Sequence, residues 1–335
     1  MNLSPPGTVH VVVPDDIDDA TLPSGGNAYD RQLLAGLAAL GWTVREHQVP
    51  AGAPLRPVLD ELPDGALTLV DGLLAPGVPV DRVRRLHLVV LAHMVFGVPG
   101  EREVMTAADA VLTTSEWCAR HIHETYGVPA TAAPPGVDPA PVTPPSATGS
   151  RLLCVAAVLP HKGQDVLADA LSALPGGGWG CLCVGSLERE PAFAGEVRRA
   201  APAGMRFAGP LVGADLDAAY ADADLLVLPS RADSYGMVVT EALARGIPVL
   251  TTTAQGLPDT LGRAPDGTRP GMLVPPGDPA ALAAALRRWL SEPSARDALR
   301  TSALLRRTAL TGWSRTATLA SDVLSTVAMR ESTSR

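Results

Sequence analysis

Residues 225–251 read LLVLPSRADSYGMVVTEALARGIPVLT, a segment in which two short apolar runs flank a loop and a helical pattern. The runs at 225–228 and 249–251 have the length and composition of buried strands, and the residues from about Gly236 to Arg245 favour a helix. A strand that returns to its sheet through a helix pairs in parallel with the next strand. The segment therefore predicts part of a parallel α/β sheet.

The same alternation of strand and helix continues on both sides of this segment. In the second half of the chain, strands are expected at 152–156, 181–184 and 205–207, and helices at 164–174, 196–200 and 215–221. In the first half, strands are expected at 11–13, 43–47, 67–70, 86–91, 111–113 and 131–133, with a helix at 27–40. Two such blocks predict the α/β class with two Rossmann-like, doubly wound domains.

A stretch rich in Pro, Ser and Thr, residues 138–150, interrupts this alternation and has the composition of a linker. The expected divisions are an N-terminal domain at 1–138, the linker at 139–150, a second domain at 151–311 and a closing helical segment at 312–335. Further helical patterns lie at 279–291, 293–308 and 313–329. Because ligands of open parallel sheets bind beyond the carboxyl ends of the strands, we expect the chemistry in a cleft between the two domains.

The composition is that of a globular protein with small-molecule ligands. Of the 335 residues, 46% are apolar and 19% are charged, and the net charge of -8 disfavours nucleic acid as a partner. No run approaches the roughly 20 apolar residues of a membrane span, and the N-terminus lacks a basic segment before an apolar run, so a cytoplasmic enzyme is expected. The cysteines lack disulfide or zinc spacing and are expected in the core: Cys118, Cys154, Cys181 and Cys183.

The use of lysine in this chain is unusual. Among the 27 basic residues only Lys162 is a lysine, in a chain that otherwise uses arginine. Lysine carries a compact, strongly hydrated charge on a flexible stem, whereas arginine needs room for a planar group. Lys162 is therefore the first candidate for a binding or catalytic residue.

The loop that leads into the helix at 236–245 has the features of an anion-binding site. The start of a helix presents unpaired backbone N–H groups and the positive end of the helix dipole, which suit a diphosphate and sugar hydroxyls. Asp233 lies in the loop, and Glu241 lies inside the helix eight positions later. Two carboxylates so placed can accept hydrogen bonds from different diols of one bound molecule, a geometry that suits a sugar nucleotide.

The spacing of Asp233 and Glu241 resembles the Glu-x7-Glu signature of family 4 glycosyltransferases, retaining enzymes with the two-domain GT-B fold. The resemblance implies that Glu241 holds the ribose hydroxyls of the nucleotide and that Asp233 has a catalytic role at the donor sugar. It also implies that donor sugar and diphosphate contact the residues between them, namely Ser234, Tyr235, Gly236 and Met237. In this fold the last helix, here within 312–335, crosses back to the N-terminal domain.

The segment VLPHKGQDVL at 158–167 resembles the Lys-Gly loop of the same family. The resemblance makes Lys162 a catalytic and donor-binding residue with His161 beside it, because a fixed cation stabilises the charge that builds on the departing diphosphate. The family usually adds an arginine about five residues earlier, where this chain has Ala157. His161 and Arg231 are the candidates to replace that arginine.

Three further landmarks complete the resemblance. The glycine loop PSGGN at 23–27 resembles the loop on the acceptor side of the family's cleft. The resemblance implies that Gly25, Gly26 and Asn27 lie on the acceptor side. It also implies that Gly26 contacts the donor. His93, at the end of a predicted strand, resembles the family's cleft histidine beside the donor sugar and the attacking hydroxyl, and this implies a catalytic role. In the second domain, the strand end that precedes Leu211 is expected to hold the base.

The family resemblance implies transfer of a hexose from a UDP- or GDP-sugar to a hydroxyl of a small-molecule, lipid or glycan acceptor, with retention of anomeric configuration. A donor phosphate oxygen then takes the acceptor proton, so neither a metal nor another cofactor is expected. One alternative is an epimerase or a phosphorylase on a GT-B scaffold, although a pyridoxal phosphorylase needs a lysine and Lys162 is already assigned to phosphate. The other is a degenerate, non-catalytic sugar-nucleotide binder, which the missing arginine favours.

Overall fold

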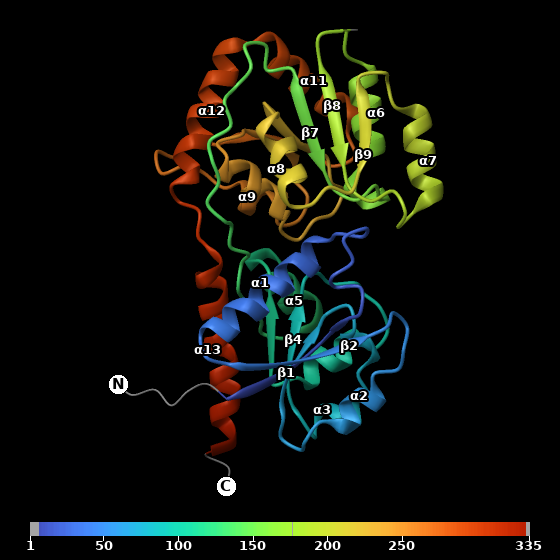
Figure 1. Ribbon diagram of the computed structural model, residues 1–335, viewed down its shortest axis with the longest axis vertical. Helices are drawn as coiled ribbons and strands as arrows, with labels where there is room; N and C mark the ends of the chain where they lie inside the picture. Colours follow the sequence, from blue (N-terminus) through green and yellow to red (C-terminus); the bar gives the residue numbers. More distant parts are fainter. Residues whose placement is uncertain (1–6, 176, 333–335) are drawn as a thin grey trace. The chain divides into compact units, whose positions relative to one another are not determined.

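Two parallel sheets, one in each half of the chain, organise the computed structural model, which describes residues 7–175 and 177–332 (Figure 1). Within these residues the first sheet has the strand order β2-β1-β3-β4-β5-β6, and the second has the order β12-β11-β10-β7-β8-β9. All neighbouring strands in these two orders run parallel. The predicted parallel α/β architecture with two Rossmann-like sheets is thereby confirmed.

The chain divides into two compact units, one around each sheet. Unit 1 holds the chain up to Asp18, Gly26–Gly136 and the chain from Gly312 onward, and unit 2 holds Asp19–Gly25 and Val137–Thr311. The stretch expected as a linker therefore groups with the second sheet, and so does the short segment 19–25. The closing segment groups with the first sheet.

Unit 1 surrounds the first sheet. Its strands are β1 (Thr8–Pro14), β2 (Thr43–Val49), β3 (Leu67–Asp71), β4 (His87–Ala92), β5 (Ala110–Thr113) and β6 (Thr131–Ala132). Its helices are α1 (Gly25–Ala39), α2 (Arg56–Glu61), the 3-10 turn η1 (Ala75–Gly77), α3 (Val80–Val83), α4 (Glu101–Ala107), α5 (Glu116–Tyr126) and α13 (Trp313–Ser332).

Unit 2 surrounds the second sheet. Its strands are β7 (Arg151–Val155), β8 (Gly180–Val184), β9 (Met205–Gly209), β10 (Leu225–Leu228), β11 (Val249–Thr252) and β12 (Gly271–Val274). Its helices are the 3-10 turn η2 (Pro160–Lys162), α6 (Gln164–Ser172), α7 (Pro191–Ala200), α8 (Gly213–Ala221), α9 (Met237–Ala244), α10 (Leu257–Leu261), α11 (Pro279–Ser291) and α12 (Pro293–Arg307).

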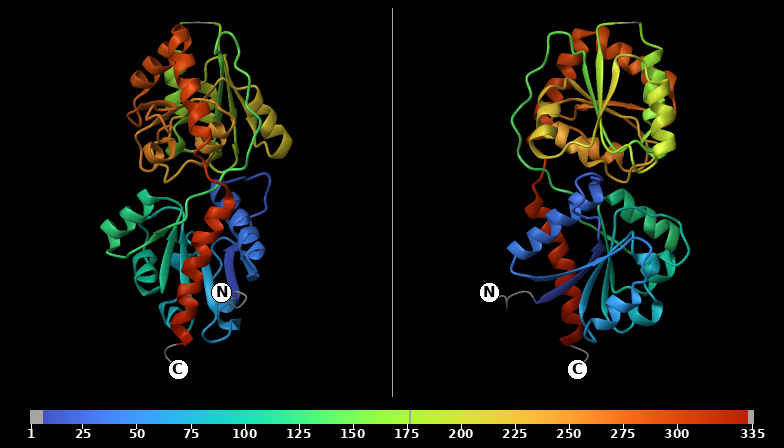
Figure 2. Two further views of the ribbon diagram at one scale, coloured as in Figure 1. Left: turned by 90° about the vertical axis from the view of Figure 1, so that its left-hand side faces the viewer. Right: turned by 45° about the vertical axis from the view of Figure 1, so that its right-hand side comes forward.

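Helices cover both faces of the sheet in each unit, which explains why the central strands are apolar on both sides (Figure 2). Leu152 and Cys154 of β7 pack in one cluster with α6 and α11, whereas Leu153 between them packs in another cluster with α9 and α10. The alternation follows from the pleat of a strand, since successive side chains point to opposite faces. All four cysteines are free and buried, as the sequence predicts.

Besides the 3-10 turn η2, two elements of unit 2 were not predicted, the edge strand β12 and the short helix α10. Pro270 and Gly271 stand at the start of β12, and Pro258 lies in the first turn of α10. Proline and glycine usually mark turns and loops, so local pattern gives no signal for these elements. Both depend on tertiary pairing, since β12 adds to the edge of the sheet beside β11.

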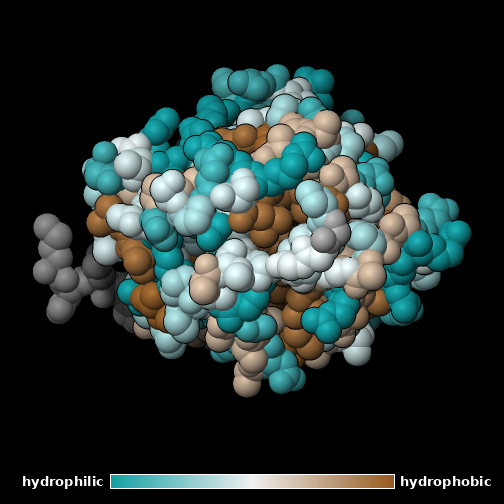
Figure 3. All heavy atoms as spheres, turned by 90° about the horizontal axis from the view of Figure 1, so that it is seen from above, coloured by the Kyte–Doolittle hydropathy of each residue, from teal (hydrophilic) through white to brown (hydrophobic). Residues whose placement is uncertain are grey.

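The surface shows no unusual concentration of apolar side chains in the view of Figure 3, where brown patches alternate with hydrophilic groups, as on most water-exposed surfaces. Among the helices that the structure describes, we find none with both the length and the apolar character needed to cross a lipid bilayer.

Candidate active site

The strand order of the second sheet reverses between β10 and β7. β7 comes first along the chain and has β8 on one side and β10 on the other, so the loops after β7 and β10 leave the sheet next to each other. Open α/β sheets bind ligands at such a reversal. Lys162 lies in the loop after β7, and Asp233 lies in the loop after β10.

Lys162 and Asp233 contact each other at this point. The Lys162 Nζ donates to Asp233 Oδ2 at 2.7 Å, and 23% of the lysine side chain and 10% of the aspartate side chain are exposed. Partial burial weakens screening by water, so this ion pair is stronger than a typical surface pair. The structure thus brings together two of the residues that the sequence singled out.

Backbone contacts fix the loops that carry these residues. The Arg231 N–H donates to the His161 carbonyl at 2.7 Å. Gly163, which ends the first loop, has φ +74°, and a Cβ at this position would lie 2.3 Å from the carbonyl oxygen of Pro229. Only glycine allows both the conformation and the approach. The glycine after Lys162 is therefore needed for the two loops to meet.

The loop from Asp233 to Gly236 is held from behind by the loop after β11. The Gly256 N–H donates to the Asp233 carbonyl at 3.1 Å, and a Cβ at Gly256 would lie 1.9 Å from the Ser234 carbonyl oxygen. Gly236 itself adopts φ +79° immediately before α9. Because these backbones are in direct contact, the first turn of α9 and its amide groups are preorganised.

Glu241 lies on α9 and is half-buried. Its Oε2 accepts a hydrogen bond at 2.7 Å from the hydroxyl of Tyr220 on α8, and the guanidinium of Arg245 lies 4.5 Å from the centre of the Tyr220 ring. Burial raises the pKa of Glu241 above its usual value, although the bond from Tyr220 opposes this shift. Glu241 and Asp233 therefore have different partners, and Tyr220 is a neighbour that sequence spacing did not indicate.

The two candidates to replace the missing arginine differ in their surroundings. Arg231 donates to both carboxylate oxygens of Asp165, at 2.8 and 2.6 Å, and also to the Pro160 carbonyl at 2.7 Å, so its charge is already paired. His161 stands next to Lys162 in η2, and burial followed by the charge of Lys162 lowers the pKa of its imidazole. Arg231 is thus engaged by Asp165, as Lys162 is engaged by Asp233.

A buried glutamine supports the loop where the arginine is absent. The Gln164 Nε2 donates to the carbonyl oxygens of Ala157 at 2.9 Å and of Ala156 at 3.3 Å. A Cβ at Gly185, which follows β8, would lie 2.1 Å from the Ala156 carbonyl oxygen. Gln164 thus holds the backbone at Ala156 and Ala157 in place. The sequence shows no sign of this role, because Gln164 appears in it only as the first residue of a predicted helix.

The remaining donor-side residues from the sequence lie in the same unit, except Gly26, which belongs to unit 1. Ser234 is buried, whereas Tyr235, Met237 and Leu211 are partly buried, the last in the segment after β9. Leu211 packs against the core cluster that contains α9.

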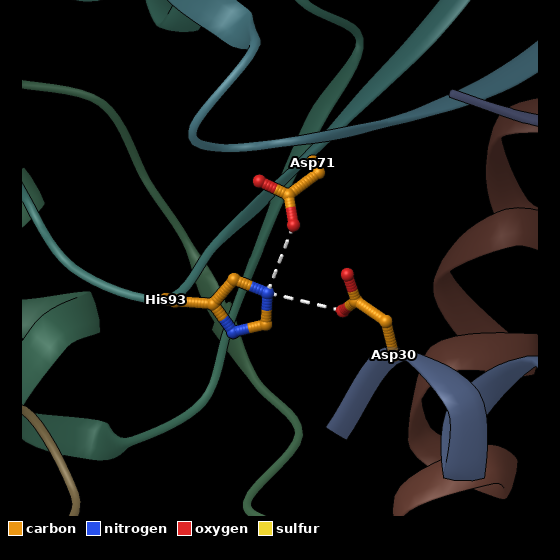
Figure 4. Close-up of side chains that lie close together, drawn as sticks. All are labelled: Asp30, Asp71 and His93. Carbon is orange, nitrogen blue, oxygen red and sulfur yellow. Dashed lines mark ion pairs between the residues drawn. The ribbon is translucent and has the colours of Figure 1, made fainter. Parts of the chain in front are cut away.

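A second group of polar side chains lies at the carboxyl edge of the first sheet, in unit 1. Asp71 ends β3, His93 follows β4, and Asp30 lies on α1 (Figure 4). His93 Nε2 lies 3.0 Å from Asp30 Oδ1 and 3.3 Å from Asp71 Oδ2. Sequence reasoning found His93 but missed both aspartates. Asp71 could have been noticed, because it is an acidic residue at the end of the apolar strand 67–71, where side chains of a parallel sheet often face a ligand.

The charges of this group depend on one another. Burial raises the pKa of the Asp30 carboxyl to about 7. Burial acts on Asp71 in the same direction, but its contacts with His93 outweigh burial and hold its pKa below the usual value. Burial disfavours the charged form of His93, yet Asp30 and then Asp71 raise the pKa of its imidazole to about 10. Ligand atoms of the three residues lie within 4.8 Å of one another, a donor set that could also hold a metal ion.

The glycine loop of the first half leads into α1 close to this group. A Cβ at Gly26 would lie 3.6 Å from the His93 ring, so the loop and the histidine are in contact. Asn27 is buried, and its Nδ2 donates to the Asp16 carbonyl at 3.1 Å. Gly25 groups with unit 2, in which a Cβ at this position would lie 3.7 Å from Met237 Sδ.

Comparison with known proteins gives matches in both sequence and structure. Residues 149–292 match the protein family described as glycosyl transferases group 1. D-inositol 3-phosphate glycosyltransferase of Kineococcus radiotolerans is 31% identical over 261 residues, which cover 65% of this chain and 57% of that protein. Sulfoquinovosyl transferase SQD2 of Arabidopsis thaliana is 37% identical over 91 residues, 27% of this chain and 18% of that protein. The chain thus spans little more than half of the first relative.

Solved structures match nearly the whole chain. Sucrose-phosphate synthase from Thermosynechococcus elongatus has a TM-score of 0.76 at 20% identity, covering 96% of this chain and 99% of that one. Anabaena HepE in complex with UDP-glucose has a TM-score of 0.74 at 17% identity, covering 95% and 99%. At this level of identity the likeness establishes the fold.

Proposed function

We infer that this chain, which belongs to the group 1 glycosyl transferases, also known as family 4, transfers a hexose from a nucleoside-diphosphate sugar to an acceptor hydroxyl with retention of configuration. The family and the GT-B fold that the motifs implied are confirmed by the matches in sequence and structure. The activity, the donor and the acceptor are our proposal.

One observation carries the proposal: Lys162 and Asp233 meet at 2.7 Å where the second sheet reverses its strand order. An ammonium beside a preorganised helix start suits the diphosphate of a donor. When the donor binds, Lys162 exchanges its contact with Asp233 for the phosphate oxygens, and Asp233 becomes available to the hydroxyls of the sugar. Glu241, on the helix that follows, holds the ribose.

The reaction needs stabilisation of charge at the leaving group more than it needs a protein nucleophile. As the bond to the diphosphate breaks, negative charge grows on the phosphate oxygens, and Lys162 together with the first amides of α9 stabilises it. A phosphate oxygen of the donor takes the proton of the attacking hydroxyl on the same face, so configuration is retained. No step of this scheme requires a metal ion.

The names of similar proteins suggest the choice of donor and acceptor. HepE was solved with UDP-glucose, which favours a uridine nucleotide and a hexose for this chain. The names of other matches include an inositol phosphate acceptor and a sucrose phosphate product, and both involve a phosphorylated polyol or sugar. We propose a UDP-hexose donor and an acceptor hydroxyl on a small polar molecule, a lipid headgroup or a glycan.

The test is a thermal-shift screen with UDP- and GDP-sugars, followed by measurement of nucleoside diphosphate release with the donors that bind. A ligand that binds the folded state raises the melting temperature in proportion to its concentration relative to Kd. We expect one nucleotide class to stabilise the protein, and Glu241→Gln to weaken that binding. Absence of stabilisation by every sugar nucleotide would contradict the proposal.

A non-catalytic sugar-nucleotide binder is the second candidate, and a specific observation favours it. Ala157 replaces the arginine of the phosphate clamp, and Arg231 is paired with Asp165. With a single cation at the phosphates, binding can persist while turnover is lost. Slow release of nucleoside diphosphate without acceptor would exclude this candidate, whereas tight binding without release across a panel of acceptors would support it.

A further inference from the structure

Asp30, Asp71 and His93 come from three different elements of unit 1 and meet at one point (Figure 4). Their side chains are 3%, 2% and 15% exposed. Two carboxylates in so little water repel each other unless protons or a cation lie between them. The ring nitrogen Nε2 of His93 occupies that position, at 3.0 Å from Asp30 and 3.3 Å from Asp71.

The backbone fixes Asp71 at the strand end. Asp71 Oδ1 accepts from the Leu73 N–H at 2.6 Å, which leaves Oδ2 turned to His93. The Gly72 N–H donates to the Leu91 carbonyl at 2.8 Å, and a Cβ at Gly72 would lie 2.9 Å from the same oxygen. The ends of β3 and β4 are therefore held together, and Asp71 and His93 with them.

The packing around the ring fixes His93 as well. The Tyr29 ring meets it edge-on, with ring centres 5.4 Å apart, while the Tyr29 hydroxyl donates to the Ala133 carbonyl at 2.8 Å. Thr114 Oγ1 donates to the His93 carbonyl at 3.3 Å. Within the part of the chain that the structure describes, the carboxylates of Asp30 from α1 and Asp71 from β3 form ion pairs with the ring of His93.

We propose that Asp30 and Asp71 are positioning residues that hold His93 as a fixed imidazolium, so that His93 serves the transfer reaction as a charged group and not as the base that deprotonates the acceptor. This inference rests on the proposed function. A general base must be unprotonated at the working pH. The contacts of Nε2 with two carboxylates favour the protonated ring, in agreement with a pKa of about 10. The acceptor proton must then go elsewhere, as in transfer to a donor phosphate oxygen.

The same three side chains could instead bind a divalent cation, and the two states differ in a measurable way. A metal ion at Nε2 would require the neutral imidazole, because the ligand atom must be free of its proton. The proposal requires a proton on that nitrogen. The protonation state of His93 therefore decides between them.

The first experiment is nitrogen-15 NMR of the full chain with labelled histidine, in which His93→Gln identifies the His93 signals. We expect the ring of His93 to remain doubly protonated from pH 6 to pH 9, and zinc or manganese added at one equivalent to leave it unchanged. Titration near the usual value of about 6.5 would overturn the proposal, and so would loss of the Nε2 proton on metal binding. This measurement does not depend on enzymatic activity, so it can fail or succeed independently of the proposed function.

The second experiment compares the pH dependence of kcat and KM in Asp30→Asn and Asp71→Asn. Loss of either carboxylate removes a contact that raises the pKa of His93, so the ring should lose its proton about 1 pH unit or more lower, with activity falling above that pH. Asp71→Glu should restore the wild-type profile in part. Asp81→Asn, which removes an exposed carboxylate from the same unit, is the matched control and should leave the profile unchanged. Activity that instead rises with pH as His93 loses its proton would show that His93 is a base.

Discussion

At the scale of single residues, a charge has most effect where water cannot screen it, and Lys162 meets this condition. It is the only lysine in the sequence, and 23% of its side chain is exposed beside Asp233. The 2.7 Å contact with Asp233 holds the ammonium at the edge of the sheet where we propose that the donor phosphates bind. In the proposed reaction, Lys162 stabilises the negative charge that builds on the departing diphosphate.

Lys162→Ala should lower the rate of donor cleavage by about 100-fold or more, the usual effect of removing one preorganised stabilising group. The measurement is release of nucleoside diphosphate under saturating donor. Arg199→Ala removes a cation from the exposed end of α7 and serves as the control, with activity expected to stay at the wild-type level. A rate within twofold of wild type in Lys162→Ala would remove this residue from the mechanism.

Gly163→Ala and Gly209→Ala separate the effect of backbone conformation from that of space. Both glycines lie in unit 2 with nearly equal φ, +74° and +77°, but only Gly163 faces a backbone carbonyl, whereas nothing lies within 4 Å of a Cβ at Gly209. We expect a loss of stability of about 1 kcal/mol for Gly209→Ala and about 3 kcal/mol or more for Gly163→Ala. Urea denaturation measures both. If both variants lost the same amount of stability, the close approach of the Pro229 carbonyl would not be what requires glycine at position 163.

The sequence singles out some of these residues as candidates and gives no indication of others. Lys162, Asp233 and Glu241 could be found because their motifs are local, with each loop following a recognisable strand. Asp30, Asp71 and Tyr220 could not, because each matters through a partner that is distant in the chain. Tyr220 lies 21 positions before Glu241, and Asp30 lies 63 positions before His93, spacings that have no meaning until the sheet is formed.

At the scale of elements, the stretch 139–150 was expected as a linker because its composition is that of a loop, yet it is tied to the second sheet. The Asp224 carboxylate, 2% exposed, accepts from the Ser146 N–H at 2.7 Å and from the Arg151 guanidinium at 2.9 Å. The Trp289 indole donates to the Gly149 carbonyl at 2.7 Å. Composition describes the lack of helix and strand here, but the attachment depends on Asp224 and Trp289, 78 and 140 positions away from their partners.

Asp224→Asn should make unit 2 less stable above about pH 4 and remove part of its acid sensitivity. Burial works against the charged carboxylate, but the bonds from Arg151 and Ser146 outweigh it and lower the pKa of Asp224 from 3.8 to about 2. A lowered pKa stabilises the folded state above pH 3.8, and this contribution, about 2 kcal/mol, is lost as the pH falls through that window toward 2. Urea denaturation from pH 7 to pH 3 measures the effect.

Asp222→Asn is the matched control for this pH dependence. Asp222 pairs with the same arginine at 2.8 Å, but 78% of its side chain is exposed. Exposed ion pairs contribute little, so its replacement should change stability by less than about 1 kcal/mol at any of these pH values. An Asp224→Asn variant that loses stability with falling pH as steeply as the wild type would show that this carboxylate is not the group that senses acid.

Among the strands, too, some could be predicted from the sequence and one could not. The strands β1 to β11 are visible in the sequence as short runs of strand-forming residues, and central strands such as β3 and β10 are buried along their whole length between helices on both faces of the sheet. The edge strand β12 was missed, since Pro270 and Gly271 precede an apolar run of only three residues. Its pairing with β11 supplies what the local pattern lacks.

At the scale of the whole molecule, the chain leaves unit 1 near Gly136 and returns to it near Gly312. The helix α13 then packs on the first sheet through a buried face made of Thr316, Ala317, Ala320, Leu324 and Val327. Small residues allow a close approach, since a Cβ at Gly36 of α1 would lie 2.5 Å from the Ala317 Cβ. The Trp42 indole also donates to Ser321 Oγ at 2.9 Å. Unit 1 is therefore completed only by the last part of the chain.

Removal of residues from Gly312 onward should therefore destabilise unit 1 while unit 2 stays folded. The truncation exposes the apolar surface that α13 covers, and burial of such surface contributes about 25 cal/mol per Å². We expect rapid proteolysis within 26–136 and retained thermal stabilisation by the sugar nucleotide that we propose unit 2 binds. Leu324→Ala, with its fully buried side chain, should weaken unit 1 by about 3 kcal/mol, whereas Met329→Ala, which is 62% exposed, should have little effect. A truncated chain whose first unit resists protease like the full chain would show that α13 is dispensable for that unit.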